Sequence, residues 1–382
     1  MQSSFRLDMN AHRLIRRQLI WIAILWISFF TSAIANTKIT YQETRIPMSE
    51  AGPKGLEALL VWPNDSKPHP VVLISHGSPR DPNDRPKMSA ISYLPIAMQF
   101  ARRGFSVAVV MRRGYGSSGG DYVENYGSEC ATANYLRAAL ASSKDLHAVI
   151  QYLSTVASFN IHKILAVGVS AGGFATIALT ADQPPQGLVA AISFAGGRGS
   201  KADNVICNKN NLIQTFGTLG KTSRIPMLWI YANNDHFFNP TLARQFYNAF
   251  SKNGGNAELI IVPDYDDEGH FLFSINGISR WTPIVDDFLK NQHLVLVNKL
   301  LPLPDNSNLV APKILSLNGK QDFEKYVQAA PHKAFALSSD GAYGWRTGER
   351  SVEEAKLQAI NYCQKYTQEL CKIIAVDDEM IK

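Results

Sequence analysis

The sequence predicts an α/β protein, with a doubly wound, mostly parallel β-sheet followed by a small C-terminal α+β domain. From about residue 40 to residue 290, short apolar runs typical of strands alternate with amphipathic stretches typical of helices. This order builds a parallel sheet with helices on both faces. The central apolar runs are nearly continuous, as expected for strands that are buried on both faces. Beyond residue 293 the alternation stops, which indicates a second unit.

The elements of the sheet domain follow from these patterns in chain order. The expected strands are Glu57–Trp62, Pro70–Ser75, Phe105–Met111, Ile164–Val169, Val189–Phe194, Pro226–Tyr231 and Ala257–Val262. The expected helices are 131–157, 173–180, 241–251 and 283–290. A polar extension carries the strand from Met227 as far as Asp235.

The N-terminus has the pattern of a cleavable secretory signal. Four arginines within the first 17 residues precede the apolar run Ile20–Phe30, and the small residues Ala33 and Ala35 follow it. We therefore expect a signal peptide over residues 1–35, cleaved after Ala35, and a periplasmic or secreted protein. The apolar run is short for a membrane span of about 20 residues. An uncleaved anchor is the alternative; after cleavage no membrane span is expected.

The charge distribution gives no indication of nucleic-acid binding. The chain of 382 residues has a formal net charge of +6. Residues 1–35 hold four basic residues and one acidic residue, so their removal lowers the charge to about +3. The remaining sequence has no Lys/Arg block, which a nucleic-acid-binding surface needs.

Four cysteines fit an exported protein with two disulfides. Cys363 and Cys371 are close in sequence and are expected to pair, which leaves Cys130 for Cys207. Three pairings are possible in all, and free buried thiols are the alternative. The cysteine spacings do not resemble a zinc site, and neither a metal nor a cofactor is expected.

The domain boundaries are set by prolines near the C-terminal end. We expect the sheet domain over residues 36–293, a proline-rich linker over 294–331 and a disulfide-bearing α+β domain over 332–382. In the last unit, 334–337 and 372–376 are strand-like. Ser351 and Glu354 form a capping box before a helix that runs from Val352 to about Lys365.

The segment Gly168-Val-Ser170-Ala-Gly172 matches the G-x-S-x-G pattern of a nucleophile elbow. In such an elbow the serine lies on a sharp turn from a strand to a helix, and glycines two residues away on either side leave room for it. The pattern alone is weak, because an ordinary tight turn also uses glycine. The strand before it and the helix after it favour the nucleophile.

A serine nucleophile needs a histidine base that is oriented by a carboxylate. In a sheet of this kind the order along the chain is serine, acid, histidine. Asp235 ends a predicted strand, and His270 follows the last one, with Gly269 beside it. We therefore expect a Ser170–Asp235–His270 triad. His236 adjoins the acid and is expected to point elsewhere; the alternative acids Asp264, Asp266 and Asp267 lie in the loop of His270 itself.

Two backbone N–H groups are expected to stabilise the oxyanion. The residue after the nucleophile, Ala171, supplies the first. The second is expected from Ser78 in the turn after Ser75, since Pro79 has no N–H, with Gly77 as the alternative. His76 in this turn is expected to brace the loop. The glycine-rich turn 112–120 lacks the spacing of a phosphate-binding loop, and residues 121–130 are expected at the pocket rim.

These motifs together resemble the α/β-hydrolase superfamily over residues 40–292. The resemblance is to its dienelactone hydrolase-like and prolyl-oligopeptidase-like branches, and it is carried by His76-Gly-Ser, Arg113-Gly-Tyr-Gly-Ser-Ser-Gly-Gly, Gly168-Val-Ser-Ala-Gly-Gly, Asn234-Asp235 and Gly269-His270. It implies a serine hydrolase fold and triad. Dienelactone hydrolases carry cysteine in the elbow, where this chain has Ser170. The tail resembles small disulfide-bearing domains of exported bacterial proteins.

Three functions are consistent with this sequence. The first is an exported serine hydrolase that cleaves small carboxylic esters through an acyl-enzyme on Ser170. The second is a serine peptidase of prolyl-oligopeptidase type, although no acidic pair stands out that would bind a free N-terminus. The third is a non-catalytic protein of the cell envelope that binds through its tail domain. The sequence does not define the oligomeric state.

Overall fold

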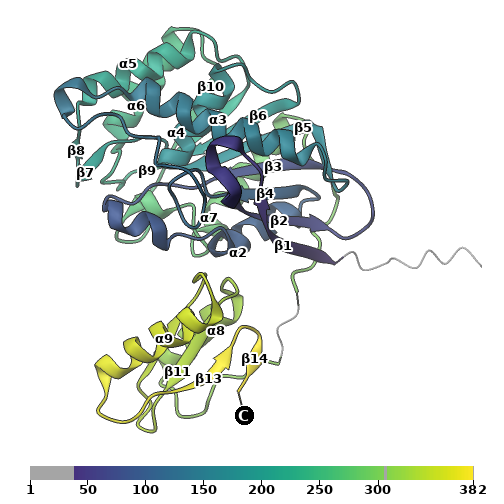
Figure 1. The fold of residues 1–382 in the computed structure, drawn as a ribbon, viewed down its shortest axis with the longest axis vertical. Helices are drawn as coiled ribbons and strands as arrows, with labels where there is room; N and C mark the ends of the chain where they lie inside the picture. The colour runs from purple at the N-terminus through teal and green to yellow at the C-terminus, as the bar shows by residue number, and fades with distance from the viewer. Residues whose placement is uncertain (1–37, 305–307, 382) are drawn as a thin grey trace, which may run out of the picture. The chain divides into compact units, whose positions relative to one another are not determined.

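A twisted eight-stranded sheet forms the centre of the sheet domain in the computed structural model, which describes residues 38–304 and 308–381 (Figure 1). The predicted signal peptide lies outside the described residues. The strand order is β1-β2-β4-β3-β5-β6-β9-β10. The pairs β1·β2 and β2·β4 are antiparallel and all other neighbours are parallel. The predicted doubly wound, mostly parallel sheet is therefore confirmed. Its strands are β1 Ile39–Ile46, β2 Leu56–Pro63, β3 His69–Ser75, β4 Ser106–Val110, β5 Phe159–Val169, β6 Leu188–Phe194, β9 Met227–Ala232 and β10 Ala257–Val262.

Helices cover both faces of this sheet. They are α2 Leu94–Ala101, α3 Tyr135–Leu153, α4 Ala171–Ala181, α5 Lys209–Gly220, α6 Pro240–Lys252 and α7 Ile278–Asn291. One apolar core joins the sheet to helices α3 to α6, and a second core joins its other face to α2 and α7. Strand β3 supplies both cores, because Val71 and Leu73 point to the first while Val72 and Ile74 point to the second.

Helix starts and strand ends follow local chemistry. Asn239 caps α6 by accepting a hydrogen bond from the N–H of Leu242, and Pro240 occupies the first helical position. Strand β9 ends at Ala232 rather than at Asp235 as predicted, because Asn233 to Asp235 turn away from the sheet. That turn positions Asp235 beyond the carboxyl end of the strand.

Some elements were not predicted from sequence. Strand β1 has the mixed sequence Ile-Thr-Tyr-Gln-Glu-Thr-Arg-Ile and pairs only with β2 at the sheet edge, so it lacks an apolar run. Helices α2 and α5 were also missed, together with the short hairpin of β7 Ser200–Ala202 and β8 Val205–Ile206.

The C-terminal unit has a four-stranded antiparallel sheet in the order β12-β11-β13-β14. Its elements are α8 Leu317–Gln328, β11 Ala334–Leu337, β12 Tyr343–Arg346, α9 Val352–Cys363, β13 Lys372–Val376 and β14 Glu379–Met380. The predicted linker 294–331 needs correction, because its second half contains α8. Phe323 and Tyr326 of this helix pack on Phe335 in the core of the unit. Helix α8 was not predicted, because the prolines that flank it indicated a linker.

The cap of α9 is confirmed in one direction. Ser351 Oγ accepts a hydrogen bond of 3.2 Å from the N–H of Glu354. Over residues 38–304 and 308–381, no return bond from the Glu354 carboxylate to Ser351 is formed.

Both expected disulfides are present. Cys130 is bonded to Cys207 with a Cα–Cα distance of 4.9 Å, and Cys363 to Cys371 with 6.2 Å. In the described part of the chain, no helix is both long enough and apolar enough to cross a membrane.

Candidate active site

Ser170 occupies a strained turn between β5 and α4. Its backbone has φ 56° and ψ −121°. Residues other than glycine seldom adopt a positive φ of this kind. The two flanking glycines are required by space. A Cβ atom on Gly168 would lie 2.2 Å from the carbonyl oxygen of Gly172, and one on Gly172 would lie 2.0 Å from that of Ser75. The predicted sharp strand-to-helix turn is therefore present.

Asp235 and His270 form a buried pair. The imidazole Nδ1 lies 3.1 and 3.2 Å from the two carboxylate oxygens. His270 is 5% exposed and Asp235 is 1% exposed. The carboxylate also accepts hydrogen bonds of 2.8 Å from the N–H groups of Phe237 and Phe238. These bonds fix the carboxylate, which leaves Nε2 of His270 as the nitrogen available for a reaction.

Two side chains that sequence reasoning missed hold the loop of His270. Glu268 accepts hydrogen bonds of 3.0 Å from the N–H groups of His270 and His236. Asn234 bonds to the backbone of Tyr265 and Asp266. The only feature of the sequence that could have indicated this role is that Asn234 and Glu268 lie within two residues of the predicted acid and base.

The other candidate histidine and acid are engaged elsewhere. His236 Nδ1 lies 3.1 Å from the Glu268 carboxylate, so its side chain does point away from the acid, as expected. Asp264 accepts a hydrogen bond of 2.7 Å from the side chain of Asn233.

Phe237 contacts the imidazole of His270 and also lines the pocket of Ser170. Its ring stacks on that of His270, with centroids 4.0 Å apart. In the part of the chain that the structure describes, the Ser170 hydroxyl forms no hydrogen bond, either with His270 or with another side chain. Catalytic hydrogen bonds are often long without substrate and tighten when it binds, so the reaction requires the hydroxyl and the imidazole to come within hydrogen-bond distance of each other.

Two backbone N–H groups are available beside the hydroxyl. Ala171 is the first residue of α4, where the helix offers no acceptor for its N–H. The N–H of Ser78 likewise donates to no described residue. Both residues line the cavity of Ser170, and Gly77 packs so closely that a Cβ there would lie 3.3 Å from the Ser170 Cβ.

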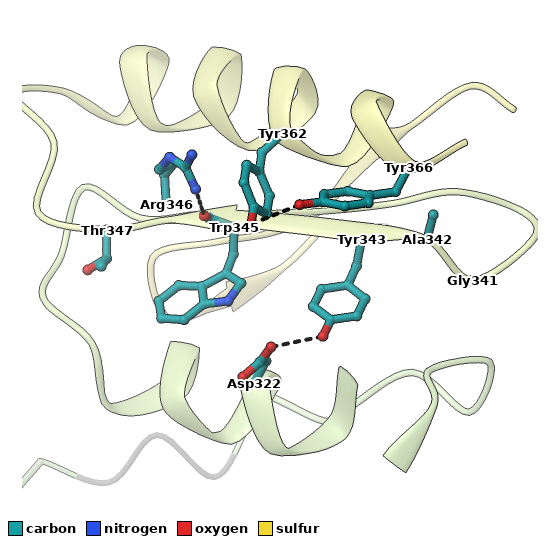
Figure 2. Close-up of a pocket in the computed structure, with 9 residues that line it drawn as sticks. All are labelled: Asp322, Gly341, Ala342, Tyr343, Trp345, Arg346, Thr347, Tyr362 and Tyr366. Carbon is teal, nitrogen blue, oxygen red and sulfur yellow. Dashed lines mark hydrogen bonds between the residues drawn. The ribbon is translucent and has the colours of Figure 1, made fainter. Parts of the chain in front are cut away.

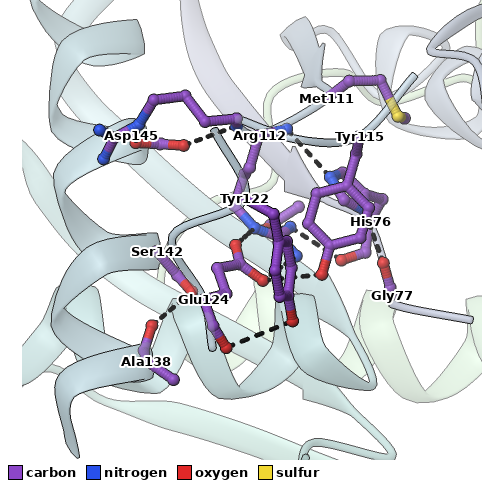
Figure 3. Close-up of polar contacts among 12 residues, drawn as sticks. His76, Gly77, Met111, Arg112, Tyr115, Tyr122, Glu124, Ala138, Ser142 and Asp145 are labelled. Atoms are coloured by element: carbon purple, nitrogen blue, oxygen red, sulfur yellow. Dashed lines mark hydrogen bonds and ion pairs between the residues drawn. The ribbon is translucent and has the colours of Figure 1, made fainter. Parts of the chain in front are cut away.

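His76 has a structural position. It is fully buried, with Nδ1 donating to the carbonyl oxygen of Gly77 at 2.5 Å and Nε2 accepting from the N–H of Arg112 at 3.0 Å (Figure 3). Burial and the nearby Arg112 guanidinium hold the pKa of His76 well below its ordinary value. A neutral His76 thus braces the turn that carries Gly77 and Ser78.

A buried ion network supports the same turn. Glu124 lies between Arg112 and Arg198, and its carboxylate bonds to both guanidinium groups and to the hydroxyl of Tyr115. Arg112 also donates to Ser75 Oγ at 2.7 Å and to the carbonyl oxygen of His76 at 2.8 Å. Burial opposes ionisation of Glu124, but Arg112 and Arg198 outweigh it and hold its pKa far below the ordinary value.

This network was not predicted from the sequence. The glycine-rich turn after β4 was expected to be only a tight turn, and residues 121–130 only a pocket rim. The available signal was the pair Arg112-Arg113 directly after a buried strand, since such charges need buried partners. Arg113 has its own partner in Asp145 of α3, to which its N–H and Nε donate at 2.8 and 2.7 Å.

The cavity beside Ser170 is small and basic. Its volume is about 100 Å³. Ser78, Ala171 and Ser170 line one side, and the aromatic rings of Tyr122, Tyr126, Phe237 and Phe238 line others. The charged residues that line the cavity are Arg80, Arg85, Arg198 and Lys201. Among the described residues that line it, none is acidic.

The C-terminal unit has a larger cavity of about 650 Å³. Aromatic side chains from β12 and from the end of α9 line it, and the Asp322 carboxylate accepts a hydrogen bond of 2.8 Å from the hydroxyl of Tyr343 (Figure 2). The rings shown are Tyr343, Trp345, Tyr362 and Tyr366. The lining has no serine, cysteine or histidine, so this cavity offers a binding surface but no nucleophile–base pair.

Metal chemistry has no obvious site in the described ranges. Over residues 38–304 and 308–381, no group of three or more His, Cys, Asp or Glu side chains is arranged to hold a metal ion.

Comparison with a family of known proteins finds a match over part of the sheet domain. The model of the X-Pro dipeptidyl-peptidase (S15) family matches residues 53–220, which is less than half of the chain. The acylamino-acid-releasing enzyme 2 of Oryza sativa subsp. japonica is 25% identical over 168 residues. That alignment covers 44% of this chain and 19% of the rice protein, so the chain matches about a fifth of that relative's length.

Solved structures with a similar arrangement include esterases and peptidases. An esterase of Pyrococcus furiosus is 15% identical, with a TM-score of 0.45 over 67% of this chain and 90% of the esterase. A protein of Klebsiella pneumoniae named "Putative Dienelactone Hydrolase" is 16% identical. Its TM-score is 0.45 over 66% of this chain and 99% of the Klebsiella chain. An acylaminoacyl peptidase of Pyrococcus horikoshii is 15% identical, with a TM-score of 0.47 over 75% and 44% of the two chains.

Proposed function

We propose that the chain is a serine hydrolase of the α/β-hydrolase superfamily and that it cleaves carboxylic esters through an acyl-enzyme on Ser170. The observation that carries this proposal is the strained turn at Ser170, which holds the hydroxyl in one cavity with the unbonded N–H groups of Ala171 and Ser78. The ring of Phe237, which lines the same cavity, stacks on His270 of the buried Asp235–His270 pair.

The proposed reaction needs only groups of this chain, the ester and water. Ser170 Oγ forms a bond to the acyl carbon while its proton passes to Nε2 of His270. The N–H groups of Ala171 and Ser78 stabilise the oxyanion, and Asp235 holds the imidazolium. When the carbon–oxygen bond to the alcohol breaks, His270 returns the proton to the alcohol. A water molecule then attacks the acyl-enzyme by the same path and releases the acid.

A peptidase is the second candidate, because the matched family and the rice relative carry peptidase names. Enzymes that remove dipeptides need a negative group to hold the free α-amine. The described lining of the Ser170 cavity has basic side chains and no acidic one, which disfavours a cationic amine. This contrast supports the ester in preference to the dipeptidyl substrate.

Export is part of the proposal. The two disulfides suggest an oxidising compartment, and the sequence of residues 1–35 has the pattern of a secretory signal. We propose a periplasmic or secreted enzyme. Determining the N-terminal residue of the protein isolated from its host tests the expected cleavage after Ala35; a chain that still begins at Met1 contradicts it.

The experiment that tests the activity combines labelling with turnover. A fluorophosphonate probe should label the wild-type protein and not Ser170→Ala, and p-nitrophenyl acetate hydrolysis by the variant should fall about 10³-fold or more. A circular dichroism spectrum checks that the variant is folded.

The same assays separate the alternatives. A non-catalytic binding protein would neither react with the probe nor turn over esters. A peptidase would cleave acylated or free peptides with a higher kcat/KM than matched esters of the same acyl group. Either outcome would overturn the proposed ester hydrolysis.

A further inference from the structure

The charges around the Ser170 cavity are not balanced. Four basic side chains line it, and no described lining residue is acidic. Arg80 is paired, because it donates to Asp203 at 2.9 Å and to Ser200 Oγ. Arg198 has Glu124, but that single carboxylate also serves Arg112. Two buried guanidinium groups thus share one negative charge, and the cluster keeps a net positive charge beside the serine.

Arg198 keeps one donor free. The residue is 4% exposed, and its Nη1 and Nη2 groups donate to the loop of Glu124. Its Nε is buried and has no partner among the described residues. A buried polar donor without a partner is costly, so a ligand that accepts from it would recover that free energy.

Arg85 is the least satisfied of the four. Its guanidinium lies over the ring of Tyr122, 3.5 Å from the centroid, which fixes its plane. Within the described ranges it forms no ion pair and no side-chain hydrogen bond, and its Nε is buried without a partner. A planar cation held in this way is suited to a carboxylate, which can accept two parallel N–H bonds.

Lys201 adds a further positive charge at the same cavity. It comes from β7 and lies near the ring of Tyr126, with Nζ 5.6 Å from the centroid. No described acidic side chain pairs with it. The unmatched charges of Arg85 and Lys201 therefore come from the loops before and after the elbow and meet at one cavity.

We propose that this cavity binds a carboxylate of the substrate, so that the enzyme prefers short hemiesters of dicarboxylic acids to neutral esters. The inference rests on the proposed ester hydrolysis. Arg85 binds the distal carboxylate with Arg198 Nε beside it, while Ser170 attacks the ester carbonyl. The products are the dicarboxylate, the alcohol and a proton. A volume of about 100 Å³ limits the acyl chain to a few carbons.

The test compares matched substrates at pH 7.5. Monomethyl glutarate carries the distal carboxylate, and methyl 5-amino-5-oxopentanoate replaces it with a neutral amide of the same shape. We expect kcat/KM to favour the charged ester by roughly 10- to 100-fold, since bonds to charged groups are strong. Arg85→Gln should abolish that preference, because kcat/KM for the charged ester should fall far more than kcat/KM for the neutral ester. Added salt should weaken the preference as well.

A matched control removes the same charge elsewhere. Arg244 is exposed on α6, so Arg244→Gln should keep the full preference. Free glutarate should inhibit the wild type competitively and Arg85→Gln at least tenfold less. Equal kcat/KM for the two esters in the wild type, or a preference that survives Arg85→Gln, would overturn the inference.

The outcome is separable from that of the proposed function. Labelling of Ser170 by fluorophosphonate with turnover of both esters at equal rates would retain the hydrolase and reject the carboxylate site. No labelling and no turnover of either ester would reject the hydrolase itself, and the carboxylate preference with it.

Discussion

At the scale of single residues, Asp235 shows how a carboxylate is fixed for one task. Two backbone N–H groups and the imidazole Nδ1 all donate to it. Asp235→Asn can keep the backbone bonds through its oxygen, but then turns an amide N–H toward His270. This selects the wrong tautomer, so ester turnover should fall roughly 10³- to 10⁴-fold, as in the serine protease example of the same change.

The control for that change is the acid in the histidine loop. Asp264→Asn removes the same charge from a residue that bonds to Asn233 rather than to His270, and it should retain turnover within a few-fold. Initial rates with p-nitrophenyl acetate measure both. A large loss in Asp264→Asn together with an active Asp235→Asn would reverse the assignment of the acid.

His76 predicts a pH dependence of stability. It is neutral in the fold, since one ring nitrogen donates and the other accepts, and its pKa lies well below the ordinary value. The unfolded chain takes up a proton at this position below about pH 6.5 and the folded protein does not. The contribution is therefore fully present above pH 6.5 and is lost as the pH falls, by about 1.4 kcal/mol per pH unit.

Urea unfolding at pH 7.0 and pH 5.5 measures the total change, to which other groups also contribute. Nuclear magnetic resonance of the histidine rings isolates His76, which should remain neutral down to pH 5.5. A normal titration of His76 near pH 6.5 would contradict the braced turn.

At the scale of elements, the elbow depends on a close approach of α4 to β3. Gly172→Ala would place a methyl group 2.0 Å from the carbonyl oxygen of Ser75 and 2.4 Å from that of His76. Backbone cannot yield to this contact without moving the turn of Gly77. We expect destabilisation of about 3 kcal/mol or more, measured by thermal unfolding.

The control substitution is made at an exposed glycine in the short 3₁₀ segment Ser49–Lys54. Gly52 has a positive φ but no atom within 4 Å of an added Cβ, so Gly52→Ala should cost about 1 kcal/mol from backbone strain alone. Equal losses in the two variants would mean that the close approach does not govern the elbow.

The elements were predictable where a repeating pattern dictates them. All seven predicted strands and all four predicted helices of the sheet domain are present, because burial on two faces imposes long apolar runs. Strand β1 and helix α8 were missed, since an edge strand and a short helix between prolines need no such run. In the candidate site, the Asp235–His270 pair could be predicted, because the acid and the histidine follow the serine in the expected order along the chain. The Glu124 network could not, because its partners are 12 and 74 residues away.

At the scale of the whole molecule, the Cys130–Cys207 disulfide joins the two loops that wall the Ser170 cavity. One loop carries Tyr122 and Tyr126, and the other carries Arg198 and Lys201. The bond closes a segment of 77 residues, for which chain entropy predicts a stabilisation of about 4 kcal/mol. The Glu124–Arg198 pair links the same loops nearer the cavity.

The double variant Cys130→Ser/Cys207→Ser should lower the melting temperature and, at a temperature where it is still folded, reduce kcat/KM for esters. The matched variant Cys363→Ser/Cys371→Ser opens a bond within the C-terminal unit that spans only 8 residues. It should leave ester turnover unchanged. Differential scanning calorimetry and p-nitrophenyl acetate assays check both, and a similar loss of turnover in the two variants would contradict a specific role for the first bond.

The Cys130–Cys207 disulfide between the two loops also affects when the enzyme becomes active. While the two cysteines are still reduced, as in a reducing cytoplasm, the same loops are joined only by non-covalent contacts such as those of Arg198 with Tyr122 and Glu124. For the exported enzyme proposed above, we therefore expect poor catalysis until the two thiols are oxidised outside the cytoplasm, so that the redox state of the destination acts as the activating signal.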